Sequence, residues 1–157
     1  MPSDVLYLVV RLGADRYAIE ASQVVEVVSL VRLKALPGAP TGVAGVMNYR
    51  NEPIPVIDLN LLATGAATTP LTGTRIIIVD FATAVDQRGN VGLLVPEATE
   101  TLRLSADAFT SPGVSTAGAR YLGPVLTTDA GVIQRVSVAA LLTPELLGAL
   151  FPPAGVS

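Results

Sequence analysis

The sequence predicts a mainly β protein folded as two small barrels, and three observations indicate this. Its apolar stretches are short, rich in Val, Ile and Leu, and separated by Gly, Pro, Asn or Asp, which is typical of strands at regular spacing. The two halves of the chain repeat one order of strands, turns and caps. Half of the 157 residues are hydrophobic, which is enough to bury a core at this length.

The first half opens with a buried strand and a Gly-containing turn at Gly13, which predicts a hairpin. Strands are expected at 5–12, 16–19, 24–31, 45–49 and 53–57, with one helical turn at 21–23 and a tight turn at 50–52. Residues 31–36 alternate, which predicts that Arg32 and Lys34 face water and that Val31 and Leu33 face inward.

Pro53 and Pro55 cannot donate the hydrogen bonds of a β-ladder. The strand that contains them is therefore expected at a sheet edge or beside a bulge. Asp58 follows this strand and suits the N-cap of a short helix at 59–62.

The second half repeats the pattern after a loop at 63–73. Strands are expected at 75–81, 91–95, 98–104, 121–126 and 132–136, with loops up to Asn90 and at 105–118. A helix is expected at 143–150, with Thr143 as its cap, Pro144 in its first turn and Glu145 at the positive end of its dipole. Val91, Leu93 and Val95 are expected in the core.

An internal duplication explains the similarity of the halves. Residues 17–26 align without a gap on 91–100, and residues 45–47 and 56–62 align on 123–125 and 135–142 with one residue inserted. We therefore expect one barrel from residues 13–80, a second from 1–12 with 81–142, and a short C-terminal helix at 143–151. Barrels this small are filled by their own side chains, so binding is expected on outer surfaces or in the seam between the lobes.

The composition argues against several classes of function. The chain has no His and no Cys, which removes the usual ligands of zinc and copper and the common nucleophile–base pairs, so we expect no metal and no cofactor. Catalysis is disfavoured on the same grounds, and a catalyst built from carboxylates, Arg and the single Lys is the alternative that the composition still allows. The ten basic residues are dispersed, which argues against nucleic-acid binding. No signal peptide and no apolar run long enough to cross a membrane are visible, so we expect a cytoplasmic protein without membrane insertion.

Several motifs resemble the CheW family of bacterial chemotaxis coupling proteins. They lie at 17–19, 24–27, 45–50 and 54–59 in the first half and at 91–95, Glu100, 121–123 and 141–142 in the second. The most specific part is Asn48-Tyr49-Arg50 followed by the run Ile-Pro-Val-Ile-Asp-Leu. The resemblance extends from about residue 5 to residue 142.

The resemblance implies a single CheW-like domain over 1–157, with two SH3-like barrels and short helices. It implies a non-catalytic adaptor that couples the cytoplasmic hairpin tip of a methyl-accepting chemoreceptor, held between the lobes, to the regulatory domain of a CheA-type histidine kinase. It further implies recruitment to receptor arrays at the inner membrane face, and it allows self-association in rings. Where the family usually has Leu and Gly around the arginine, this chain has Tyr49 and Asn51, and Pro96 replaces a common acidic residue. These departures leave open whether the pathway controls flagella, pili or another output.

The family match, together with the residue types, predicts a set of partner-binding residues. They are Val24, Glu26, Val28, Gly45, Asn48, Tyr49, Arg50 and Asn51. Arg and Tyr are frequent at interface hot spots, and an apolar strand face with one charge suits an amphipathic helix. Structural alternatives remain for some of these positions. Arg50 is a solvated turn residue or pairs with a carboxylate to fix the lobes, Glu26 occupies the outward position of an alternating strand, and Gly45 relieves a bend or bulge.

A second hypothesis is a small-ligand-binding protein or a carboxylate-based enzyme. In that case Asp58 or Glu100 would act in a cleft between the lobes. This hypothesis predicts a deep pocket that contains the carboxylate, whereas the adaptor hypothesis predicts a shallow apolar groove.

Overall fold

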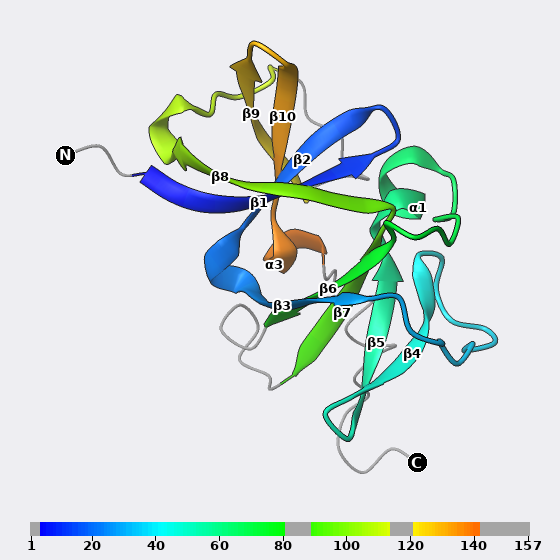
Figure 1. Ribbon diagram of the computed structural model, residues 1–157. Helices are drawn as coiled ribbons and strands as arrows, with labels where there is room; N and C mark the ends of the chain where they lie inside the picture. The colour runs from blue at the N-terminus through cyan, green and yellow to red at the C-terminus, as the bar shows by residue number, and fades with distance from the viewer. Residues whose placement is uncertain (1–3, 81–88, 114–120, 142–157) are drawn as a thin grey trace.

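The computed structural model describes residues 4–80, 89–113 and 121–141, which form two five-stranded sheets lying one above the other (Figure 1). The first, the β1 sheet, has the order β8-β1-β2-β10-β9, and the second, the β6 sheet, has the order β3-β6-β7-β5-β4. The β1 sheet consists of β1 (Asp4–Leu12), β2 (Asp15–Glu20), β8 (Glu97–Ser105), β9 (Leu122–Thr128) and β10 (Gly131–Val136). The β6 sheet consists of β3 (Val24–Ser29), β4 (Val43–Tyr49), β5 (Glu52–Asp58), β6 (Arg75–Asp80) and β7 (Asn90–Val95).

The helices are short and lie in the connections. They are η1 (Ala21–Gln23), α1 (Leu59–Thr64), η2 (Ala106–Ala108) and α3 (Val138–Leu141). In the described part of the chain no helix has the length and apolarity needed to cross a membrane. The predicted helix at 143–151 lies outside the described residues.

Each sheet closes on itself through one bridge, as the predicted barrels require. In the β6 sheet, Lys34, which follows edge strand β3, exchanges two backbone hydrogen bonds of 2.8 Å with Val46 of the opposite edge strand, β4. In the β1 sheet, Thr110, which follows edge strand β8, does the same with Val125 of β9. Closure limits the unpaired edges that could otherwise recruit other strands. The predicted mainly β class with two barrel lobes is confirmed.

The two halves of the chain exchange their first hairpins. Strands β1 and β2 join β8, β9 and β10, while β6 and β7 join β3, β4 and β5, and the parallel pairs β2–β10 and β5–β7 make the two joints. The expected lobe boundaries therefore differ from the sheets at β2 and β7, which lie with the opposite half. The reason is local. Strand β2 forms an antiparallel pair with β1, and β7 forms one with β6, so β2 lies in the same sheet as β1 and β7 in the same sheet as β6.

The registers confirm the duplication. Arg135 pairs with Ala18 in the same way as Val56 pairs with Gly92, and these are the residues that the repeat equates. The expected alignment of residues 45–47 is one residue off, since Val46 pairs with Pro55 and Val125 with Gln134. No inserted residue is then needed between residues 46–58 of the first copy and residues 125–137 of the second.

The helix caps are equivalent as well. The Asp58 side chain accepts from the Leu61 N–H at 3.1 Å, and the Ser137 hydroxyl accepts from the Ala140 N–H at 3.2 Å. The predicted cap Asp58 is therefore present at the start of α1, and Ser137 occupies the equivalent position at the start of α3.

The largest apolar cluster lies between the sheets. It joins buried residues of the β1 sheet, such as Leu8 and Ile19, to residues of the β6 sheet, including Val91, Leu93 and Val95. Smaller clusters fill each barrel. Strand β6 contributes to two clusters, with Ile77 and Val79 facing the other sheet and Ile76 and Ile78 facing its own barrel. This double burial explains why β6 is a continuous apolar run rather than an alternating one.

The predicted bulge beside the proline-containing strand is confirmed, because the β4–β5 ladder has one between Val43 and Gly45, opposite β5. The alternative, an edge position, does not apply: β5 lies inside the sheet, and its prolines are tolerated because β7 pairs only with residues 56–58. Two other local predictions need correction. Val31 is 43% exposed rather than inward, because regular pairing of β3 ends at Ser29. Residues 106–108 form the short helix η2 within the expected loop.

Candidate functional site

The β4–β5 hairpin ends in a tight loop at Arg50 and Asn51, at the end of the β6 sheet away from the β1 sheet (Figure 1). Tyr49 pairs with Glu52, so the turn is one residue shorter than predicted, and Glu52 begins β5. Arg50 and Asn51 have φ of 50° and 68°, and positive φ at both central residues is what a type I′ hairpin turn requires. The turn therefore sets the direction in which the two side chains leave the backbone.

Glu26 on β3 connects the edge of the sheet to this hairpin. The Tyr49 hydroxyl donates to Glu26 Oε2 at 2.6 Å, and Arg50 Nη2 donates to the same oxygen at 3.2 Å. The Arg50 guanidinium carbon lies 5.1 Å from the centre of the Tyr49 ring. The predicted pairing of Arg50 with a carboxylate is thus confirmed, but its predicted purpose of fixing the lobes is wrong, because both residues belong to the β6 sheet.

The members of this cluster differ in exposure. Tyr49 is 8% exposed and packs in the core of the β6 barrel, whereas the side chains of Arg50 and Glu26 are 71% and 41% exposed. The hydrogen bond to Glu26 raises the pKa of Tyr49, burial adds to the effect, and the Arg50 charge opposes it. The phenol therefore stays protonated and serves as a donor, while Arg50 presents most of its surface to solvent.

Val24 and Val28 are not part of an open apolar face around Glu26. Both are half-buried, Val24 against the inter-sheet core and Val28 against the core of the β6 barrel. The side chains of β3 that point outward are instead those of Val25 and Val27, which are 45% and 39% exposed. The alternation of β3 was recognised, but the sequence does not show which of its faces the barrel buries.

Gly45 has a structural role. Its φ is 154°, it lies beside the bulge of β4, and an added Cβ would lie 2.5 Å from the Lys34 carbonyl oxygen. The absence of a side chain thus lets the residues after β3 approach β4 and close the barrel. The bulge interpretation of Gly45 is therefore confirmed, and its contact with a partner stays a prediction.

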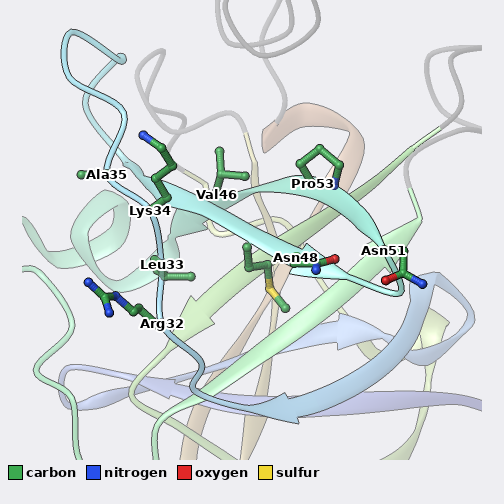
Figure 2. Close-up of a pocket in the computed structure, with 9 residues that line it drawn as sticks. Arg32, Leu33, Lys34, Ala35, Val46, Asn48, Asn51 and Pro53 are labelled. Carbon is green, nitrogen blue, oxygen red and sulfur yellow. The ribbon is translucent and has the colours of Figure 1, made fainter.

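A groove of about 850 Å³ opens beside the closing bridge. Figure 2 shows it between the segment with Arg32, Leu33, Lys34 and Ala35 and the hairpin that carries Val46, Asn48, Asn51 and Pro53. Asn48 and Asn51 were predicted as partner-binding residues. Arg32 and Lys34 were predicted only as water-facing, and the signal that could have placed them here was their alternation with inward-facing Leu33. Among the residues that the structure describes, no carboxylate lines this groove.

The two carboxylates of the enzyme hypothesis have structural partners. Asp58 is 4% exposed and accepts hydrogen bonds from the Leu61 N–H, the Thr68 N–H and the Thr68 hydroxyl, at 3.1, 2.8 and 2.7 Å. Glu100 has a 48% exposed side chain and pairs with Arg16 at 3.7 Å. Neither carboxylate lines the groove, so nothing in the described residues supports the enzyme hypothesis.

Comparison with known proteins identifies the family. The model of the CheW-like domain matches residues 6–145. The chain belongs to the CheW-like family. It is 26% identical over 101 residues to the chemotaxis protein CheW of Klebsiella aerogenes, a match that spans 64% of this chain and 58% of that protein. The structure is similar to the crystal structure of the scaffolding protein TtCheW from Thermoanaerobacter tengcongensis, with a TM-score of 0.78 and 25% identity over 93% of this chain and 92% of that one.

The two closed sheets are the SH3-like barrels that the family resemblance predicted, since the whole fold matches that of a CheW protein. Two departures from the family pattern have a structural explanation in this CheW-like chain. Tyr49 supplies the hydroxyl that binds Glu26, and Asn51 accepts the left-handed backbone of the turn. Pro96 connects β7 to β8, and no contact explains its substitution for an acidic residue.

Proposed function

We propose that the chain is a non-catalytic scaffold that couples methyl-accepting chemoreceptors to a CheA-type histidine kinase in a chemosensory pathway. The observation that carries this proposal is the likeness to a scaffolding protein along almost the full length of both chains. The packed interiors agree with it, because apolar clusters fill both barrels and the space between the sheets. Contacts with partners then belong to the outer surface.

The partner contact that we propose is centred on the β4–β5 hairpin. Arg50 and Asn51 protrude there, Asn48 is exposed beside them, and Glu26 and Tyr49 support the turn from below. An arginine with a planar fork of donors can bind a partner carboxylate through two hydrogen bonds. One of the two partners, the regulatory domain of the kinase or the hairpin tip of the receptor, would supply that carboxylate.

The proposal includes the setting in which the protein works. The chain would act in the cytoplasm, held at receptor arrays on the inner membrane face by its partners. Self-association in rings is compatible with this role, since each barrel has its own outer surface. The pathway output, flagellar or pilus-linked, follows from the receptor and kinase that the chain binds.

Titration calorimetry with purified components tests the proposal. The full chain is titrated with the regulatory domain of each CheA-type kinase of its organism and, separately, with a receptor cytoplasmic hairpin fragment. Binding at micromolar affinity or tighter to one kinase and one receptor is expected. Absence of binding to every kinase domain would contradict the scaffold role.

A charge-matched pair of variants then tests the contact. Arg50→Ala is expected to weaken binding of one partner about tenfold or more, because a hot-spot arginine is lost. Arg103→Ala removes an exposed arginine from β8 in the other sheet and is expected to leave that affinity unchanged. Equal affinities of the two variants for that partner would show that Arg50 is not part of the interface.

A further inference from the structure

The Tyr49 hydroxyl has a position that the fold alone does not require. The Tyr49 ring packs in the β6 barrel core with Met47, Ile54 and Val56, which a phenylalanine ring could do equally well. The hydroxyl instead emerges at the surface and donates to Glu26 at 2.6 Å, the shortest side-chain hydrogen bond described for this protein.

An exposed arginine–glutamate pair does not by itself fix the arginine. Pairs of this kind contribute little to stability and change geometry readily, because two long side chains lose rotamer entropy when they are held together. The Arg50–Glu26 contact, at 3.2 Å with both side chains well exposed, is such a pair. Without further support, Arg50 would sample many rotamers at the hairpin tip.

Tyr49 supplies that support because it contacts both Glu26 and Arg50. Its hydroxyl holds the same Glu26 oxygen that Arg50 contacts, and its ring lies beneath the Arg50 guanidinium, 5.1 Å from centre to carbon. The ring is anchored in the barrel core, so it transmits the rigidity of the sheet to two surface side chains. The described contacts use one guanidinium nitrogen of Arg50, Nη2.

From this geometry we infer that Tyr49 is a positioning residue, which orders Glu26 and thereby presents Arg50, with its remaining donors, to a carboxylate on the partner. The inference rests on the proposed function in that Arg50 is taken as the partner contact. Ordering the arginine before binding lowers the entropy that association loses. Tyr49 thus contributes to affinity without touching the partner.

Tyr49→Phe isolates the hydroxyl, because it keeps the ring and its contact with Arg50. The first readout needs no partner: the ¹⁵N order parameter of the Arg50 side-chain Nε–H in the free protein. It is expected to fall clearly in Tyr49→Phe and to stay unchanged in Tyr7→Phe, which removes a hydroxyl from the other sheet but retains the ring contacts with Phe109 and Arg135. An unchanged Arg50 order parameter in Tyr49→Phe would overturn the inference.

The second readout is a double-mutant cycle on the affinity for the partner that Arg50 binds. Tyr49→Phe is expected to weaken binding about three- to tenfold, and to have no effect when Arg50 is already Ala. If Arg50→Ala weakens binding while Tyr49→Phe does not, the inference fails and the scaffold proposal stands. If Arg50→Ala has no effect while the chain still binds both partners, the role of Arg50 as the contact fails and the inference fails with it.

Discussion

Gly45, one of the predicted partner-binding residues, has a role in the fold. Its backbone has φ of 154°, and the Lys34 carbonyl occupies the space where a side chain would begin. The contact lies at the bridge that joins the two edges of the β6 sheet. The role of Gly45 is therefore to let the barrel close.

Gly45→Ala is expected to destabilise the protein by about 2–4 kcal/mol, because it adds a steric clash with backbone to the strain of a left-handed conformation. Gly38→Ala is the matched control, since its φ is 80° and nothing lies within 4 Å of the added Cβ. About 1 kcal/mol is expected there, from backbone strain alone. Urea unfolding followed by circular dichroism measures both, and equal losses would exclude the clash as the cause.

At the scale of the element, the β4–β5 hairpin combines a strained turn with an anchored strand. Arg50 and Asn51 are the only non-glycine residues with positive φ in the described part of the chain. The turn remains stable because Tyr49 is buried on one side of it and Glu52 pairs with Tyr49 across the base. The hairpin thus holds Arg50 in a defined place.

Asn51→Val tests this turn. A β-branched residue strongly disfavours φ of 68°, so a loss of about 1–2 kcal/mol in unfolding free energy is expected, whereas Asn51→Gly is expected to stay near wild type. Asn48→Val places the same residue at an exposed strand position of the same hairpin and is expected to change stability by less than about 0.5 kcal/mol. A similar loss for Val at positions 48 and 51 would contradict the turn assignment.

At the scale of the whole molecule, the exchange of hairpins makes each half depend on the other. Every sheet contains strands from before and after the loop at residues 65–73, and the largest apolar cluster lies between the sheets. Neither half can therefore complete a barrel alone.

A fragment experiment follows from this dependence. Residues 1–70 and residues 71–157, produced separately, are each expected to lack the amide dispersion of a folded protein in NMR spectra. Mixed in equal amounts they are expected to recover the spectrum of the intact chain, because the parallel pairs β2–β10 and β5–β7 can still form. A native-like spectrum from either fragment alone would contradict the exchanged architecture.

Stability is also expected to fall at high pH. The pKa values of Tyr7, Tyr17 and Tyr121 are raised above 10.0, mainly by burial, and that of Tyr49 mainly by its hydrogen bond to Glu26. The unfolded chain ionises these phenols at lower pH than the folded chain, so the contribution of the tyrosines to stability is constant below about pH 10 and is lost above it. The chain has no histidine, so no histidine titration changes the free energy of unfolding near neutral pH.

Urea midpoints measured between pH 8 and pH 11 check this expectation. Tyr49→Phe should make the alkaline decrease less steep, because it removes one of the four tyrosines. An identical slope for wild type and Tyr49→Phe would show that the phenol of Tyr49 is not perturbed.

The sequence alone was sufficient for the strands, the duplication, the helix cap at Asp58 and the family, because these depend on local patterning and on the order of residues along the chain. The registers of Ala18 and Gly92 with their parallel partners bear this out. Val91, Leu93 and Val95 were placed correctly in the core for the same reason.

Only the tertiary structure decided which strands share a sheet and which face of β3 is open. Strand β2 leaves its own half and pairs with β10, Val24 and Val28 turn inward, and Tyr49 meets Glu26 although 23 positions separate them in the chain. Alternation shows that a strand has two faces, but burial depends on what packs against each face. That packing is set by closure of the barrels and by the inter-sheet core, which are contacts between residues distant in sequence.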